Sequence, residues 1–590
     1  MVRGVSIEAV AIQGRPARPV ALVAEDRTPH YSQAGLGTIA MLDSLCNLSD
    51  SGGDLVTFSV DYFSALLLHE IRFDDLLSIW RGDRTDIGRY QISYVPSLYL
   101  WVYRPDDRKS VKITDIKRWG SDTLTETAAM FGVADHAPVN RWTLTTPGDA
   151  LSLAERCASV YGQIARGIVA AFDRAGLPKY WRDGTGRVAG ALMDRMARRS
   201  DVKLYPGAIS HPIQTGYFGG RVNISTVGNL GDVTQLDIRS AYPAVMAKLP
   251  SLDGAKWRRV RSYDASIPWA LWHVSWGVSR GARLGPFPLR RNGAVTYPLN
   301  GSGWYWASEV AAAIAVFGAE SIRPDHGVYI DPASDRKPFA GISDLYKTRA
   351  ALRDSGDAAA AHVLKLALTS CYGRLAQEKK ADGSRGRWAN LALAGLVTSE
   401  TRAIMLRLYA DHWNEAAAIA TDSLTVRGTL TLPSSRDLGG LSVDHGSDAI
   451  LLPSGAYHAT KGAATMDRVS GVDRNRSRLI DWDRVRRDWG VVGLALNYHL
   501  SIPFFVGIGL AAVGGQSNYC RWKMVRRDIV GGASWDTSER IDWRTWHVYP
   551  DIGDGLASEM YVPRAGVQSR MMDQSLIDTV EAITENGTPH

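Results

Sequence analysis

This chain of 590 residues has few cysteines and no long uninterrupted apolar run. Its four cysteines, Cys46, Cys157, Cys371 and Cys520, stand far apart without a CxxC pair, so they indicate neither a zinc knuckle nor a disulfide framework. The most apolar stretch, residues 491–513, contains polar residues and a proline that are unfavourable in lipid. We therefore expect it in a protein core, with no membrane partner. The N-terminus does not resemble a secretory signal, and an intracellular location is expected, the host cytoplasm if the protein is viral.

Like-charge tracts, low-complexity segments and internal repeats are also missing. A chain of this length with 45% apolar and 22% charged residues is expected to fold throughout. It should form roughly two to four packed units. The net charge of +7 permits a polyanionic partner such as nucleic acid, but an ordinary basic enzyme fits it as well.

The order of periodic segments outlines the organisation. Residues 1–177 mix short apolar runs with a final helical stretch, which predicts an α/β unit closed by a long helix. Residues 342–354 and 358–373 are helical patterns separated by turn residues, which predicts an antiparallel helical hairpin. Arginine and tryptophan interleave in residues 451–590, a composition suited to phosphates and exposed bases.

Two aspartates stand where strands are expected to end. QLDIRSAYP places Asp237 after an apolar strand, and AIATDSLTV places Asp422 in a tight turn, at the tip of a hairpin. Carboxylates from neighbouring strands can hold two Mg²⁺ ions about 4 Å apart, as in-line phosphoryl transfer requires, with Mn²⁺ as an alternative. Taken alone, Asp237 is more often a strand-ending cap and Asp422 an ordinary turn residue.

The helical hairpin carries a second group of candidates. Lys365, Thr369 and Tyr372 share one face of its second helix. With Arg349 on the first helix, Lys365 can converge on a triphosphate. Gly373 would allow the close approach of a base pair. The alternative is a solvated helix face.

The segment GYFGGRVN contains the third group. Gly219 and Gly220 follow two aromatic residues, the first of them Tyr217. Paired glycines let a backbone approach a ligand closely, although a plain β-bend fits the segment equally well.

These segments resemble, in order, the motifs of family B DNA polymerases. DIRSAYP, which begins at Asp237, is similar to motif A (DxxSLYP), and KLALTSCYG, which begins at Lys365, to motif B (KxxxNSxYG). ATDS, which contains Asp422, is similar to motif C (DTDS). YFGG, which begins at Tyr217, resembles the YxGG linker between exonuclease and polymerase domains. The resemblance covers about residues 206–460 and is closest to the small phage, plasmid and protein-primed polymerases.

Two positions depart from these motifs. Thr369 replaces the usual asparagine of motif B, which would loosen base-pair contacts. Ala420 replaces the first aspartate of motif C. Catalysis should survive this change, because the second aspartate, here Asp422, is the principal metal ligand in the family.

The resemblance implies an α/β multidomain fold, with an RNase H-like exonuclease-type domain followed by a right hand of palm, fingers and thumb. The implied parts are the exonuclease-like domain at 1–177, the linker and first palm part at 178–330, the fingers at 331–373, the second palm part at 374–450, and the thumb and C-terminal region at 451–590.

It also implies roles for individual residues. Asp237 and Asp422 would bind the metal ions, and Arg349 and Lys365 would hold the triphosphate. Tyr242 would pack under the incoming sugar and exclude a 2′-hydroxyl. The other expected contacts are to the nucleotide, by Ser240 and Tyr372, and to DNA, by Tyr217, Gly219, Gly220, Thr369, Gly373, Ser423, Tyr457 and Lys461. The thumb's KxY signature appears here without its lysine, because Gly455 and Ala456 precede Tyr457. Lys461 is expected to supply the missing positive charge.

The N-terminal domain lacks most acids of a 3′→5′ exonuclease. Only Glu8 remains of the expected DxE pair, Phe63 stands at the next expected aspartate, and Arg156 stands at the acid of the late helix. Such nucleases need carboxylates that converge on two metals. We therefore expect no proofreading activity, unless Asp61 or Asp115 rebuilds the site.

The sequence thus predicts a template-directed DNA polymerase that extends a primer on a DNA template with deoxynucleoside triphosphates. One alternative is a polymerase that starts chains without a primer or from a priming protein, with or without an accessory factor. The long interval between motifs A and B has room for an insertion that serves this. The other alternative is a DNA-binding scaffold without chemistry, which the presence of Asp237, Asp422, Arg349 and Lys365 disfavours.

Overall fold

The computed structural model describes residues 2–11, 15–48, 54–135, 137–279, 282–291, 294–377, 386–469, 477–493, 496, 498–514, 519–530 and 551–552. Two eight-stranded sheets and one four-stranded sheet form the main layers of these residues. None of their helices is both long and apolar enough to cross a membrane.

The N-terminal domain is a mixed sheet covered by helices. Its central strand, β1 (Val2–Val10), is antiparallel to β2 and parallel to β4, and the strand order is β3-β2-β1-β4-β8-β7-β6-β5. Helix α5 (Pro147–Arg174) lies against β1 so closely that a Cβ on Gly4 would be 1.8 Å from the carbonyl oxygen of Ala158. The predicted α/β unit with a long closing helix is confirmed. Its other elements are β2 (Arg18–Ala24), β3 (His30–Tyr31), α1 (Thr38–Leu48), β4 (Asp54–Thr57), α2 (Val60–Leu67), α3 (Phe73–Trp80), β5 (Thr85–Ile87), β6 (Tyr90–Val95), β7 (Tyr99–Arg104), β8 (Lys109–Asp115) and α4 (Leu124–Met130).

The second large sheet, here the central sheet, collects strands from distant parts of the chain. Its order is β21-β20-β19-β10-β18-β17-β9, with β24 (Asp551–Ile552) beside β10. Helix α12 (Leu391–Asp411) packs against the sheet and is buried over most of its length. The strands are β9 (Arg221–Ile224), β10 (Thr226–Ile238), β17 (Ala416–Thr421), β18 (Ser423–Arg427), β19 (Leu441–Leu451), β20 (Tyr457–Lys461) and β21 (Ala464–Arg468).

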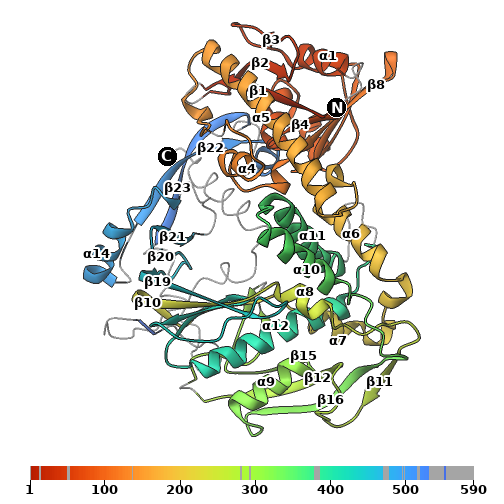
Figure 1. Ribbon diagram of the computed structural model, residues 1–590, viewed down its shortest axis with the longest axis vertical. Coiled ribbons are helices and arrows are strands. Elements are labelled where there is room, and N and C mark those ends of the chain that lie inside the picture. The colour runs from red at the N-terminus through yellow and green to blue at the C-terminus, as the bar shows by residue number, and fades with distance from the viewer. Residues whose placement is uncertain are drawn as a thin grey trace.

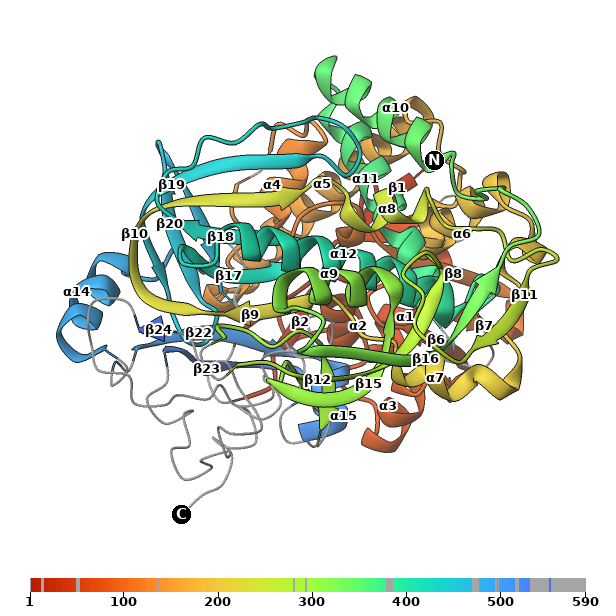
Figure 2. The same ribbon diagram turned by 90° about the horizontal axis from the view of Figure 1, so that it is seen from below.

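A four-stranded sheet, here the insertion sheet, follows β10 in the chain. Its order is β11-β16-β12-β15, and α9 (Ala307–Phe317) lies between this sheet and α12, as Figures 1 and 2 show from two sides. The elements of this part are α8 (Ala241–Met246), β11 (Lys256–Val260), β12 (Ala270–Gly277), β13 (Leu289–Arg291), β14 (Ala294–Thr296), β15 (Asn300–Trp306) and β16 (Ile322–Asp331).

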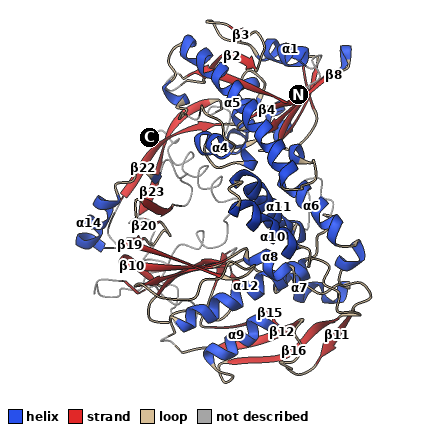
Figure 3. Ribbon diagram, viewed as in Figure 1, coloured by secondary structure: helices blue, strands red, loops and turns tan. Residues whose placement is uncertain are grey.

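The predicted helical hairpin is confirmed. Helix α10 (Ile342–Asp354) and helix α11 (Ala358–Ala376) are joined by a short turn in which Gly356 has a φ of 83°. Asp357 begins α11 as its N-cap, because its side chain accepts a hydrogen bond from the amide of Ala360. In Figure 3 the hairpin lies between the two large sheets, beside α6 (Gly184–Met196). The short helix α7 (Ser210–Thr215) follows α6 in the chain.

A C-terminal hairpin extends from the central sheet to the N-terminal domain (Figure 1). It consists of β22 (Tyr498–Val506) and β23 (Arg521–Val530), with α15 (Ile508–Gly514) at its tip. At the tip, the hydroxyl of Tyr519 donates to the carbonyl of Ala65 at 2.9 Å, and α15 packs against α3. The tip of the C-terminal hairpin thereby shares one apolar core with the N-terminal domain.

The basic, tryptophan-rich tail is only partly as expected. In α14 (Trp482–Val492), the indoles of Trp482 and Trp489 are buried in a core beside the central sheet, so they cannot stack on bases. The apolar stretch 491–513 is interrupted at its start, where Val491 is 83% exposed, although Val506 further along is buried. The segment DWRTWHVY, residues 542–549, lies outside the described residues.

We predict that Gly509→Ala weakens the docking of the C-terminal hairpin. A Cβ on Gly509 would lie 2.6 Å from the indole of Trp80, and overpacking of this kind costs about 1–3 kcal/mol. Thermal unfolding should show a lower midpoint than the wild type. Gly507→Ala is the matched control, because its nearest neighbour would be 3.7 Å away. Equal midpoints for the two variants would contradict the prediction.

Candidate active site

Asp237 and Asp422 come from adjacent strands of the central sheet. Asp237 is the next-to-last residue of β10 and pairs with Ser423, the first residue of β18. Asp422 is the single residue between β17 and β18, and its carbonyl accepts a hydrogen bond of 2.9 Å from the amide of Ile238. Thr421 closes the turn with a left-handed φ of 63°. The predicted hairpin with Asp422 at its tip is confirmed, and both aspartates lie at the same end of two paired strands.

The protein leaves the negative charge of these two carboxylates incompletely compensated. Burial and the charge of Asp422 together raise the pKa of Asp237 to about 6, although its side chain remains accessible to solvent. Burial likewise raises the pKa of Asp422. Bound divalent cations would remove this repulsion, and Mg²⁺ and Mn²⁺ prefer oxygen ligands. The two side chains therefore fit such ions.

Arg349 and Lys365 reach this region from the two helices of the helical hairpin. A guanidinium nitrogen of Arg349, on α10, lies 3.5 Å from the hydroxyl oxygen of Ser240, which directly precedes α8. Lys365 is exposed on α11, and its charge lowers the pKa of both Asp237 and Asp422. The structure thus places the charge of Lys365 near both aspartates, and it places Arg349 beside Ser240, three residues after Asp237.

Three tyrosines join the predicted motifs. The rings of Tyr242 and Tyr372 lie 4.5 Å apart between centroids, and the hydroxyls of Tyr372 and Tyr217 share a hydrogen bond of 2.9 Å. A Cβ on Gly220 would lie 2.5 Å from the Cγ2 of Thr421 and 2.9 Å from the hydroxyl oxygen of Tyr242. The close approach that Gly220 permits is therefore made to the protein's own turn and tyrosine.

Four other predicted DNA contacts differ in what surrounds them. A Cβ on Gly219 or Gly373 would meet no atom within 4 Å, so both positions face open space. Thr369 is exposed, but its hydroxyl donates to the carbonyl of residue 365 in its own helix at 3.0 Å. Ser423 is buried, and its hydroxyl donates to the carbonyl of Ala420 at 3.1 Å. Both hydroxyls are engaged within the protein.

Arg468 is a cation near the aspartates that the sequence reasoning missed. It lies on β21 opposite Tyr457 and lowers the pKa of Asp237 and of Asp422. Tyr457 is buried, and its hydroxyl has no hydrogen-bond partner among the described residues. Lys461, the expected source of charge, instead forms an ion pair with an aspartate of β19. The pairing of β20 with β21 places Arg468 here, and no local motif in the sequence indicates this position.

A buried ion pair between Arg402 of α12 and Glu309 of α9 anchors the YFGG segment. The guanidinium donates to the carboxylate from Nε at 2.8 Å and from Nη2 at 2.7 Å. Its Nη1 donates to the carbonyls of Phe218 and Gly219 at 2.7 and 2.6 Å, and Thr398 donates to the former at 2.6 Å. The sequence reasoning missed this pair, although an arginine inside an apolar helix signals a buried partner.

Glu8, the acid that remains in the N-terminal domain, is fully buried beneath an arginine. Arg141 donates to its carboxylate from Nε at 3.0 and 2.9 Å and from Nη2 at 2.8 Å. The hydroxyls of Tyr62 and Ser6 donate to the same carboxylate at 3.3 and 3.1 Å. The guanidinium thus supplies the positive charge that this carboxylate would otherwise require from a metal ion.

The other acids of this domain are also engaged. Asp61 accepts hydrogen bonds of 2.8 Å from an amide and from a hydroxyl, and Asp115 accepts from two backbone amides at 2.7 and 2.8 Å. Arg156 lies at the surface in an ion pair of 3.0 Å. On the same helix, the sulfur of Cys157 lies 3.9 Å from the Arg141 guanidinium, so the helix turns Cys157, and not the predicted position Arg156, toward Glu8.

We predict that Asp237→Asn stabilises the metal-free protein at neutral pH. Folding raises the pKa of this acid from 3.8 to about 6. The folded wild type is therefore fully stable below about pH 3.8, and it loses stability as the pH rises through about 6, where the carboxyl must ionise. For a carboxyl that solvent still reaches, we expect a gain of about 1 kcal/mol near neutral pH that shrinks below about pH 5.

Thermal unfolding in the presence of a chelator measures this gain. Asp232→Asn is the control, because Asp232 is exposed on the same strand and should show no such pH-dependent gain. A variant at position 237 that is less stable than the wild type at neutral pH would contradict the prediction.

The comparisons with known proteins agree with this geometry. No protein-family model matches the chain, and no curated protein sequence is detectably similar to it. Among solved structures, phi29 DNA polymerase in complex with primer-template DNA and incoming nucleotides is similar over 90% of this chain and 99% of its own, with a TM-score of 0.66 and 11% identity. The same phage enzyme in complex with single-stranded DNA is similar over 85% and 97%, with a TM-score of 0.63 and 12% identity. The chain is therefore an α/β multidomain protein with the fold of phi29 DNA polymerase, a family B enzyme.

Proposed function

We propose that this protein is a template-directed DNA polymerase that extends a primer with deoxynucleoside triphosphates and releases pyrophosphate. The observation that carries the proposal is the placement of Asp237 and Asp422 on paired strands, with a shared excess of negative charge. Strands β9, β10, β17, β18 and β19 of the central sheet would form the palm, the helical hairpin the fingers, and the elements after β19 the thumb. The structures with the same fold hold primer-template DNA and nucleotides, which supports these partners.

The residues around the aspartates divide the work of nucleotide addition. Asp237 and Asp422 would hold two Mg²⁺ ions, which would activate the attacking 3′-hydroxyl and stabilise the leaving pyrophosphate. Arg349 and Lys365 would bind the triphosphate from the helical hairpin, Arg349 from beside Ser240 and Lys365 from near the two carboxylates. Because the charge of Arg468 acts on both aspartates whereas Lys461 is engaged in an ion pair, we assign Arg468 the contact to a backbone phosphate of the primer.

Tyr242 would form the floor beneath the incoming sugar. Its ring is fixed by Tyr372 on one side and by the tight approach of Gly220 on another. A ring held in this way cannot move aside for an additional hydroxyl group. The same contacts therefore give a physical reason for the discrimination between ribonucleotides and deoxyribonucleotides.

The N-terminal domain would act as a platform for the strand and not as a nuclease. Binding a metal at Glu8 would first require the loss of its charge-assisted hydrogen bonds to Arg141, and a buried carboxylate gives up such a partner at a high cost. Asp61 and Asp115, the acids that could rebuild a site, are likewise engaged in hydrogen bonds.

Replacing either catalytic aspartate is expected to abolish extension without abolishing DNA binding. In Asp237→Asn and Asp422→Asn the metal ions lose a carboxylate, whereas binding to DNA depends mainly on arginine and lysine contacts to phosphates. Primer extension in Mg²⁺ and a gel-shift measurement on the same samples separate the two effects. Asp232→Asn should extend primers like the wild type. Near wild-type extension by either catalytic variant would refute the two-metal assignment.

Tyr242→Ala is expected to raise the incorporation of ribonucleotides at least tenfold, because the ring would no longer occupy the space of the 2′-hydroxyl. Tyr242→Phe is the matched control, since it keeps the ring that packs on Tyr372. The measurement is competition between a ribonucleotide and its deoxy counterpart. If both variants discriminate as well as the wild type, another residue guards the sugar.

The protein is expected to leave labelled single-stranded DNA intact when Mg²⁺ or Mn²⁺ is present without nucleotides. The physical reason is the neutralisation of Glu8 by Arg141. Degradation that persists in Asp422→Asn but disappears in Glu8→Ala would show that the N-terminal domain is an active nuclease. Asp61→Asn and Asp115→Asn, assayed in parallel, would then identify the other acids.

A further inference from the structure

The insertion sheet carries a cluster of possible metal ligands that the polymerase reaction does not use. Strands β12 and β16 pair irregularly, because Trp272 faces Gly327 whereas Val274 faces Pro324. One residue of β12, His273, therefore lies opposite two residues of β16, Asp325 and His326. This arrangement is a β-bulge, which re-aims side chains and is frequent beside functional sites.

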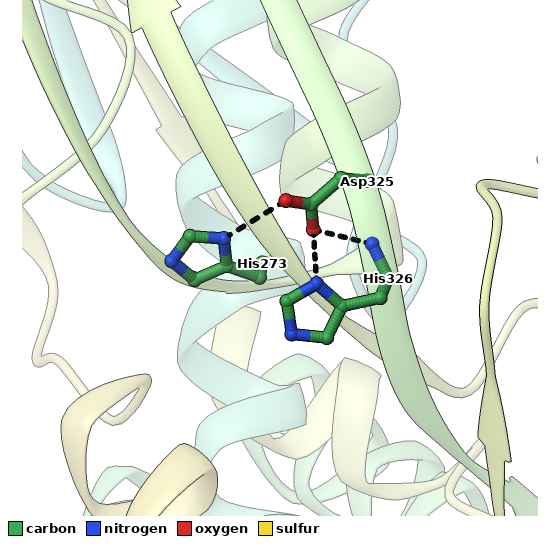
Figure 4. Close-up of side chains that lie close together, drawn as sticks. All are labelled: His273, Asp325 and His326. Atoms are coloured by element: carbon green, nitrogen blue, oxygen red, sulfur yellow. Dashed lines mark hydrogen bonds and ion pairs between the residues drawn. The ribbon is translucent and has the colours of Figure 1, made fainter.

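The bulge brings the three side chains together, as Figure 4 shows. Nδ1 of His273 lies 3.4 Å from one oxygen of Asp325, and Nδ1 of His326 lies 2.5 Å from the other. The two imidazole rings stack with centroids 5.2 Å apart. Potential ligand atoms of all three residues lie within 4.8 Å of one another, and no other group of three such residues does so in the part of the chain that the structure describes.

The protein fixes this cluster by packing. Trp304 of β15 pairs with His273 in the sheet, and its indole lies 5.3 Å from each imidazole in an edge-on arrangement. Gly327 follows His326, and a Cβ there would lie 2.6 Å from the ring of Trp272, so the backbone approaches this ring closely. The side chains are held in place on two neighbouring strands, with the imidazoles partly exposed to solvent.

We propose that His273, Asp325 and His326 bind a divalent transition-metal ion, Zn²⁺ in the first instance. Imidazole nitrogen suits zinc and its neighbours in the first transition row, whereas Mg²⁺ prefers oxygen ligands. Three protein ligands leave the fourth position of a tetrahedral site to water or to an outside donor. The ion would cross-link β12 to β16, at a site on the insertion sheet and separate from Asp237 and Asp422 on the central sheet.

Zinc binding to the full-length protein tests the proposal. Equilibrium dialysis with Zn²⁺ is done in excess Mg²⁺, which occupies the catalytic carboxylates, and bound zinc is measured by elemental analysis. We expect one zinc ion per chain, with at least tenfold weaker binding in His273→Ala, Asp325→Asn and His326→Ala. His211→Ala is the control, because His211 is an exposed histidine on α7 outside the cluster.

Two further readouts identify the ligands and the cross-link. Co²⁺ bound in place of zinc should give visible absorption bands that disappear in His326→Ala and persist in His211→Ala. Zinc should raise the thermal unfolding midpoint of the wild type and of the control but not of the three cluster variants. His326 and Asp325 are more than half exposed, so their replacement leaves the core intact. Absence of zinc binding, or equal affinity in the cluster variants and the control, would overturn the proposal.

Discussion

Arg402 and Glu309 pair in the core between α12 and α9, and the geometry of the whole candidate site depends on them. Both residues are almost completely buried. The one guanidinium nitrogen that does not bind the carboxylate, Nη1, donates to the carbonyls of Phe218 and Gly219. This fixes the YFGG segment, whose last residue, Gly220, lies close to both Tyr242 and Thr421 in the turn before Asp422. An uncompensated charge at this depth would be strongly destabilising, so the two partners must remain together for the motifs to meet.

Acidic side chains have opposite surroundings in the N-terminal domain and in the central sheet. In the central sheet, Asp237 and Asp422 face each other without a strong ion pair, and their pKa values are raised. In the N-terminal domain, Glu8 is neutralised by a bidentate contact to Arg141. A carboxylate pair that repels is suited to bind cations, whereas a carboxylate that already has a buried cation is not. This difference supports both proposals, catalysis at the central sheet and a structural role for the N-terminal domain.

The C-terminal hairpin makes these domains interdependent. Its base adjoins the central sheet through α14, and its tip enters the core of the N-terminal domain, where Tyr519 binds a carbonyl 454 positions earlier in the chain. The N-terminal domain therefore has a structural task of its own, because it holds the far end of the hairpin. The buried indoles of Trp482 and Trp489 belong to the same support and not to a surface for bases.

The sequence alone was sufficient for the features that local patterns determine. Strand, turn and helix periodicity predicted the turn at Asp422 and the helical hairpin, because each of these is encoded within a short stretch of chain. The polymerase fold was implied by the resemblance of the motifs to those of family B DNA polymerases. Only the tertiary structure revealed the contacts between segments that no pattern connects. Arg402 meets Glu309 across 93 positions and Arg141 meets Glu8 across 133, and a strand pairing places His273 beside Asp325 across 52. Such contacts depend on the register of the strands and on the packing of the helices. The sequence around each residue does not show which distant residue it will contact.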